Sequence, residues 1–118
     1  MKDYMLIYKG GVKDWMANTT QEEMAESMQK WEAWMGDLGQ KGQLTSGGSP
    51  LEYSGKQITA EGVVTDVSLA EIKELVTGYS IVKAANMEEA IVIAKNCPTF
   101  SYPDITVEVR EVVDMGPD

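Results

Sequence analysis

Hydrophobic residues alternate with a period of two in several short segments of the chain, which is typical of β-strands. The segment YMLIYKG at 4–10 predicts a strand. Its apolar side chains fall on both faces: Tyr4, Leu6 and Tyr8 point one way, and Met5 and Ile7 point the other. Apolar residues on both faces are typical of a central strand. The segment DITVEVREVV at 104–113 instead alternates apolar with polar residues, so it predicts a strand with one solvated face.

A second period, close to that of an α-helix, begins near Gln21. Thr20 and Glu23 have the spacing of a capping box, and Gly39 with Gly42 predicts the end of the helix. The apolar stripe recurs at spacings of four and three residues: Met24, Met28, Trp31, Met35 and Leu38. We interpret this stripe as core, with Trp34 at its margin.

The segment MEEAIVIAKN at 87–96 predicts a second amphipathic helix. Asn86 is expected to cap it and Pro98 to enforce its end. The expected apolar face consists of Met87, Ala90, Ile91 and Ala94.

The middle of the chain predicts shorter elements. Residues 42–48 are typical of a short strand that runs into a glycine bend, and residues 49–66 of hairpin segments with turns near Ser54-Gly55 and Glu61-Gly62. Residues 70–77 indicate either a short helix or a turn, and a strand is expected from Tyr79 to Ala85.

The element order is therefore strand, helix, strand, inserted hairpin, strand, helix, strand, within a single domain of residues 1–118. This is the βαββαβ order of a ferredoxin-like α+β sandwich. Two helices cover only one face of such a sheet, whereas the first strand is apolar on both faces. The hairpin could cover part of the second face of the sheet. Pairing of this face with the same face of another copy is the simpler way to bury it. We therefore predict a homodimer.

Composition narrows the classes of function. The chain has 118 residues, of which 43% are hydrophobic and 25% charged, with a net charge of −9. Such a negative surface disfavours binding to nucleic acid. The apolar runs are too short for a membrane helix and the N-terminus lacks the features of a secretion signal, so we expect no membrane association and a cytoplasmic location.

The absence of histidine excludes Ser-His and Cys-His catalysis and histidine-containing metal sites. The single cysteine, Cys97, agrees with a reducing compartment, and we interpret it as a structural thiol. Neither glycine-rich nucleotide-binding motif is present. Acid–base chemistry would depend on Asp, Glu, Lys or Tyr, and we expect no metal and no cofactor.

The stretch VVTDVSLAEIKELVTGYSIVKA at 63–84 concentrates the candidate chemistry. Asp66 is interpreted either as a cap of the next segment or as a ligand-facing catalytic acid or base. Glu71 and Lys73 are interpreted either as a solvated face or as binding residues. The remaining candidate binding residues are Tyr8, Trp34, Ser46 and Tyr79.

Several motifs in this order resemble the YCII-related proteins and, among them, the DGPF-domain branch: MLIY at 5–8, SGGSPL at 46–51, GVVTD at 62–66, AEIKE at 70–74, GYSIVKA at 78–84, MEEAIVIAKNCP at 87–98 and VEVR at 107–110. The resemblance implies a dimeric α+β barrel of ferredoxin-like protomers. The motif that names the branch is degenerate, since Asp66-Val67-Ser68-Leu69 stands in its place. The His-Asp pair of another branch does not carry over, because this chain has no histidine.

Three functions fit these observations. The first is a small-molecule enzyme, or a degenerate one, with a pocket between sheet and hairpin near Asp66, Tyr79, Ser46 and Tyr8. The second is a non-catalytic module that binds a small apolar or aromatic ligand. The third is a protein-interaction module.

Overall fold

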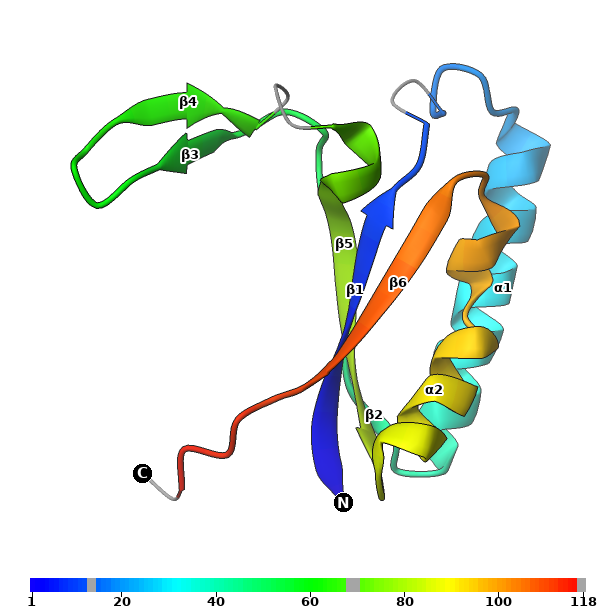
Figure 1. Cartoon of the computed structure of the whole chain (residues 1–118). Coiled ribbons are helices and arrows are strands. Elements are labelled where there is room, and N and C mark those ends of the chain that lie inside the picture. The colour runs from blue at the N-terminus through cyan, green and yellow to red at the C-terminus, as the bar shows by residue number, and fades with distance from the viewer. Residues whose placement is uncertain (13–14, 68–70, 117–118) are drawn as a thin grey trace.

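The computed structural model describes residues 1–12, 15–67 and 71–116, which form a four-stranded sheet with two α-helices on one side and a separate hairpin (Figure 1). The elements are β1 (Lys2–Gly10), α1 (Gln21–Gln40), β2 (Leu44–Pro50), β3 (Lys56–Ile58), β4 (Val64–Asp66), the 3-10 helix η2 (Ile72–Glu74), β5 (Val76–Ala84), α2 (Met87–Lys95), the 3-10 helix η3 (Pro98–Ser101) and β6 (Ile105–Glu111). The strand order is β2-β5-β1-β6, with antiparallel pairing throughout. The structure therefore confirms the ferredoxin-like α+β arrangement with an inserted hairpin.

Strand β1 is central, as its two apolar faces predict, and pairs with β5 on one side and β6 on the other. Burial alternates along it: Tyr4, Leu6 and Tyr8 are buried beneath the helices, whereas Met5 and Ile7 on the other face are half-buried. Strand β5 repeats this alternation, with Ser80 and Val82 buried. The core thus lies between the helices and one face of the sheet.

The predicted start of α1 is confirmed. The Thr20 hydroxyl accepts a hydrogen bond from the Glu23 backbone N–H at 3.1 Å, and the Glu23 carboxylate accepts one from the Thr20 backbone N–H at 3.2 Å. The helix runs through Gly39 and ends at Gln40, before Gly42 adopts a φ of +69°. Only the second of the two predicted stop residues therefore marks the end.

The predicted stripe of α1 is wrong at one position, Met28, and Trp34, which was placed at its margin, belongs to the buried face. Trp34 and Leu38 are its buried side chains, whereas Met28 is 62% exposed. The reason is lateral packing: α1 lies beside α2 and η3 as well as on the sheet, so its buried face is turned toward Trp34. The spacing of apolar residues along the sequence does not indicate that α2 and η3 pack beside the helix.

Helix α2 shows a similar shift. The Asn86 side chain accepts a hydrogen bond from the Glu89 backbone N–H at 2.9 Å, which confirms the cap. The buried residues are Ala90, Ile93 and Ala94, so the assignment of Ile91 to the core is wrong. Ile91 is 38% exposed because the helix is rotated toward Ile93.

The inserted segment forms the β3–β4 hairpin, with its turn at Gly62 as predicted. The hairpin projects from the side of the sheet opposite the helices and does not lie over it (Figure 1), so it gives the second face no cover. All six residues of β3 and β4 are exposed. The following segment contains η2, one of the two alternatives predicted for 70–77, and β5 begins at Val76, earlier than predicted. Ser68 and Leu69, the last two positions of the degenerate motif, lie outside the described residues.

Candidate functional site

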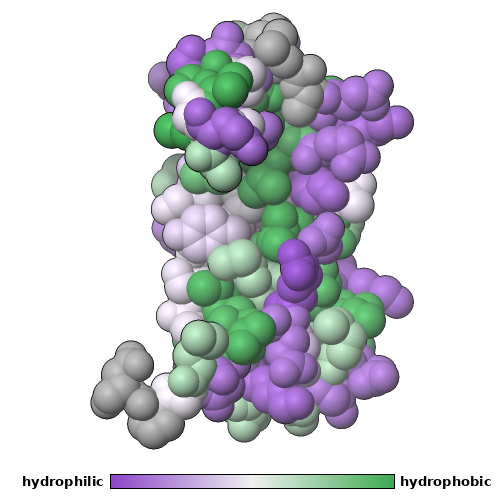
Figure 2. All heavy atoms as spheres, turned by 60° about the vertical axis from the view of Figure 1, so that its left-hand side comes forward, coloured by the Kyte–Doolittle hydropathy of each residue, from purple (hydrophilic) through white to green (hydrophobic). Residues whose placement is uncertain are grey.

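The open face of the sheet, opposite the helices, has an apolar centre. In the register of β1 and β5, Met5 lies opposite Ile81 and Ile7 lies opposite Tyr79. Residues directly opposite each other in an antiparallel pair point to the same side, so these four side chains adjoin one another. All four are half-buried. Figure 2, which turns this side forward, shows hydrophobic atoms in a band bordered by hydrophilic ones.

One end of the open face carries an ordered carboxylate, that of Asp3. Its Oδ1 accepts hydrogen bonds from the Thr45 hydroxyl at 2.6 Å and from the Lys83 ammonium at 3.1 Å. The hydrogen bond from Thr45, followed by that from Lys83, lowers the pKa of Asp3 below its ordinary value. The Asp3 carboxylate is therefore ionised near neutral pH, held in place and balanced by the Lys83 ammonium.

The other end of the open face carries a cation between two acids. The Lys9 ammonium lies 3.5 Å from a Glu108 carboxylate oxygen and 3.7 Å from a Glu74 oxygen. The Lys9 side chain is only 22% exposed, whereas those of both acids are more exposed. This arrangement offers a polar group of a ligand both a donor and acceptors beside the apolar centre.

Two of the predicted binding residues lie on this sheet face or at its edge. Tyr79 belongs to the apolar centre, and Ser46 of β2 is paired with Ile81. The Ser46 hydroxyl accepts a hydrogen bond from the Gly48 backbone N–H at 3.1 Å, where β2 is irregular. Gly48 has a φ of +72°, and a side chain there would meet the Tyr79 carbonyl.

Tyr8, which the sequence analysis grouped with Tyr79, lies on the opposite face. Its hydroxyl donates to the Ser80 hydroxyl at 2.8 Å and accepts from the Cys97 thiol at 3.4 Å. Ser80 in turn donates to the Gly47 carbonyl at 2.8 Å. Burial raises the pKa of Tyr8 and also that of Cys97. Both groups therefore stay neutral near pH 7, which fits a structural network rather than a nucleophile.

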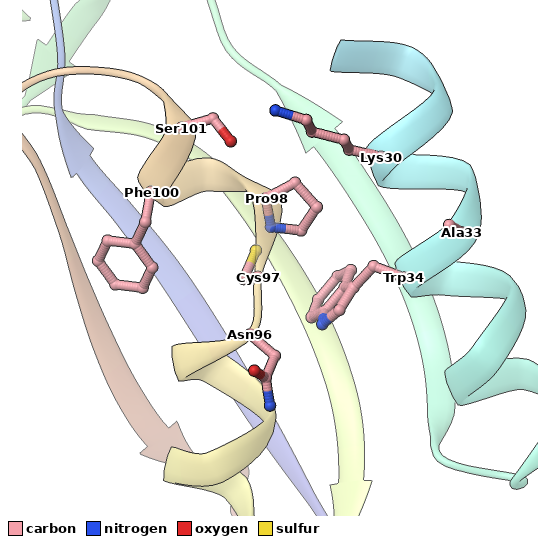
Figure 3. Close-up of a pocket in the computed structure, with 8 residues that line it drawn as sticks. All are labelled: Lys30, Ala33, Trp34, Asn96, Cys97, Pro98, Phe100 and Ser101. Carbon is pink, nitrogen blue, oxygen red and sulfur yellow. The ribbon is translucent and has the colours of Figure 1, made fainter. Parts of the chain in front are cut away.

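Trp34 lines a cavity of about 610 Å³ between α1 and the segment that joins α2 to η3. The cavity is shallow and open to solvent, and Figure 3 shows its wall: Lys30, Ala33, Trp34, Asn96, Cys97, Pro98, Phe100 and Ser101. It lies on the helix side of the molecule. Trp34 is therefore separated by the sheet from Tyr79.

The three charged candidates of the 63–84 stretch do not converge. Asp66 forms an ion pair with Lys56 across the hairpin, and half of its side chain is exposed. Lys73 pairs with Glu71 at 3.4 Å, and both side chains are mostly exposed. Neither of the two cavities described for the chain includes these residues. Within one chain Asp66 lies on the hairpin, whereas Glu71 and Lys73 lie at the start of η2, which contacts the Lys9 end of β1.

The residues that complete both faces were not among those predicted from the sequence. Asp3 and Lys9 continue the Met5 and Ile7 face at alternate positions of β1, and Ser80 is the inward polar position between Tyr79 and Ile81. The period of two alone predicts these placements. Their partners come from distant segments: Glu108 for Lys9, and Cys97 for Tyr8.

The described residues contain neither a metal site nor a membrane-spanning helix. No group of three or more Cys, Asp or Glu side chains has the arrangement needed to hold a metal ion. None of the described helices is long and apolar enough to cross a membrane.

Comparison with known families decides the identity. A family model for the YCII-related domain matches residues 4–116. The chain belongs to the YCII-related family. A search of the curated proteins found no match. The matched range contains both α-helices and the β3–β4 hairpin.

Proposed function

We propose that this YCII-related protein is a homodimer that binds a small apolar or aromatic molecule between the open sheet faces of its two chains. The observation that carries the proposal is the apolar centre of Met5, Ile7, Tyr79 and Ile81, which no described element of the chain covers. A second copy on this face would complete a dimeric α+β barrel. Such isologous pairing buries the same patch on both chains.

Burial of apolar surface supplies the energy for this association. Each of the four central side chains is already half-buried against its strand neighbours, so a partner needs to exclude only the remaining water. Charged groups surround this apolar centre: Glu108 and Arg110 on the edge strand β6 lie opposite Ile7 and Met5, and Asp3 with Lys83 and Lys9 lie at the two ends of the face. This distribution matches the apolar core and polar rim of stable interfaces.

The chemistry of the open face also suits a small ligand. Tyr79 offers an aromatic ring and Met5 an adaptable thioether, and Lys9 with Glu108 offers polar groups to orient the ligand. We therefore expect a compound with an apolar or aromatic body and one polar end.

A catalytic role for Asp66, proposed from the sequence, requires a contribution from the partner chain. Within one chain its carboxylate is ion-paired with Lys56 and faces solvent. The assignment to the DGPF branch likewise remains a proposal, supported by Asp66 after the VVT sequence. A cytoplasmic location is also proposed, and the reduced and buried Cys97 agrees with it.

Saturation-transfer NMR with a library of small aromatic and aliphatic acids tests ligand binding. We expect a subset of compounds to bind the wild-type dimer, with weaker binding to Tyr79→Ala and unchanged binding to the control Val92→Ala. Val92 lies on α2, outside the core, and is 59% exposed. A dimer that binds none of the compounds would contradict the ligand proposal and support the alternative, a dimeric protein-interaction module. That alternative has its own observation, the exposed Ile58, Val63 and Val64 of the hairpin.

A further inference from the structure

The β3–β4 hairpin, residues 56–66, is an arm whose strands are hydrogen-bonded to each other. Its ladder pairs Lys56 with Asp66 and Ile58 with Val64. The Thr59 backbone N–H donates a hydrogen bond to the Val63 carbonyl at 2.9 Å, which closes the turn. An isolated two-stranded hairpin is marginally stable in water. A surface that covers one face of the arm would therefore stabilise the hairpin.

One face of the arm is suited to such a surface. Ile58 and Val64 lie opposite each other and are 69% and 55% exposed, and the Lys56–Asp66 ion pair shares their face nearer the root. The other face carries the polar pair Gln57 and Thr65. The first face is therefore apolar toward the tip of the arm and charged near its root.

The direction of the arm is fixed at its root. The Tyr53 hydroxyl donates to the Gly10 carbonyl at 3.2 Å, and the Leu51 N–H donates to the Thr77 carbonyl at 2.9 Å. These bonds connect the root to the ends of β1 and β5. The arm extends from there on the side of the open sheet face (Figure 1).

The C-terminal segment after β6 leaves the sheet on this same side (Figure 1). Its Val113 and Met115 are 74% and 85% exposed. Two extensions with exposed apolar side chains therefore flank the space in front of the apolar centre, one at each end of the sheet.

We infer that the arm packs against a second copy of this chain and closes one end of the space between the two sheets. This inference rests on the proposed homodimer. Four central side chains are few beside the roughly 20–30 residues per partner of a standard interface. The arm and the C-terminal segment supply the missing apolar surface, and a partner seated on the open face lies within their reach. Each ligand site would then combine the sheet of one chain with the arm of the other.

Photo-crosslinking distinguishes contact between chains from contact within one chain. Ile58 is replaced by p-benzoylphenylalanine, and this chain is mixed with heavy-isotope-labelled wild-type chain. After subunit exchange and irradiation, we expect cross-links from position 58 to heavy peptides, which only a partner supplies. The same photoreactive residue at Val92 on α2 is the control and should give no such cross-links.

Paired substitutions measure what the arm contributes. Ile58→Asp with Val64→Asp should weaken dimerisation about tenfold or more, since both apolar contacts are lost. The matched control, Gln57→Asp with Thr65→Asp, adds the same charge on the other face of the arm and should leave the dimer constant within about threefold. Far-UV circular dichroism checks that each variant is folded.

The outcomes separate the two proposals. A dimer whose position 58 forms no cross-link to heavy peptides, or whose stability is equally affected by both variant pairs, overturns the arm inference and leaves the homodimer. A wild-type chain that remains monomeric overturns both.

Discussion

The two faces of the sheet differ in what covers them, although the same strands build both. On β1, Leu6 is fully buried beneath the helices, and its neighbour Ile7 is half-buried on the open face. Both are branched aliphatic residues at the centre of the sheet. A strand that is apolar on both faces therefore predicts that both faces are covered. It does not specify whether the cover comes from the same chain or from a partner.

The largest expected effect comes from the covered face. Leu6→Ala should lower the free energy of unfolding by about 2–5 kcal/mol, because it leaves a cavity among closely packed side chains. Ile7→Ala is the matched control from the other face and should cost the isolated chain clearly less, since its site already contacts water. Urea denaturation at a concentration where the chain is monomeric measures both. Equal losses would remove the proposed distinction between the two faces.

Substitutions on the open face should instead change the dimerisation constant. Ile7→Lys places a charge in the centre of the proposed interface and should weaken dimerisation about a hundredfold, or ~3 kcal/mol. The unfolding of the monomer should change little. Sedimentation equilibrium measures the dimer constant, with Val92→Lys on α2 as the control for added charge. An unaltered dimer constant in Ile7→Lys would show that the copies do not meet through this face.

The hydroxyl groups of two tyrosines offer a finer comparison. Tyr8→Phe should cost about 1–2 kcal/mol of folding free energy, because the buried Cys97 thiol loses its acceptor and Ser80 loses a donor. Tyr79→Phe on the open face should be nearly neutral in the monomer. Thermal unfolding of both variants distinguishes them, and a neutral Tyr8→Phe would mean that the network adds no stability.

The smallest effect concerns pH. Hydrogen bonds from Thr45 and Lys83 lower the pKa of Asp3 below its ordinary value of 3.8. Asp3 therefore stabilises the fold above that value, and the contribution is lost as the pH falls through the lowered pKa. Because the pair is partly exposed, we expect less than about 1 kcal/mol. The free energy of unfolding, measured by urea denaturation as a function of pH, should fall less steeply at acid pH in Asp3→Asn than in the wild type. Thr45→Val should show part of this effect. Identical pH dependence in the wild type and both variants would contradict the prediction.

Local patterns allowed much of the fold to be predicted. The capping box at Thr20, the cap at Asn86 and the turn at Gly62 depend on residues close in sequence, and the structure has all three. The burial of Trp34 and the exposure of Met28 could not be predicted, because they depend on where α2 and η3 pack against α1.

The candidate site was predicted less well for the same reason. Tyr79 lies at the open face as a period of two requires, and the pairing of β2 with β5 brings Ser46 opposite Ile81. The contact of Tyr8 with Cys97 spans 89 positions and has no local sign. Nor does the sequence of the hairpin specify its direction, which separates Asp66 from Tyr79 within one chain. A sequence pattern determines which side of a strand a residue occupies, but not which distant element it meets.

The central claim is that the open face belongs to a second copy of the chain, and the mass in solution tests it most directly. Light scattering of the wild-type protein at low micromolar concentration should give twice the chain mass of 13.0 kDa. A single species of 13.0 kDa under those conditions would contradict the account.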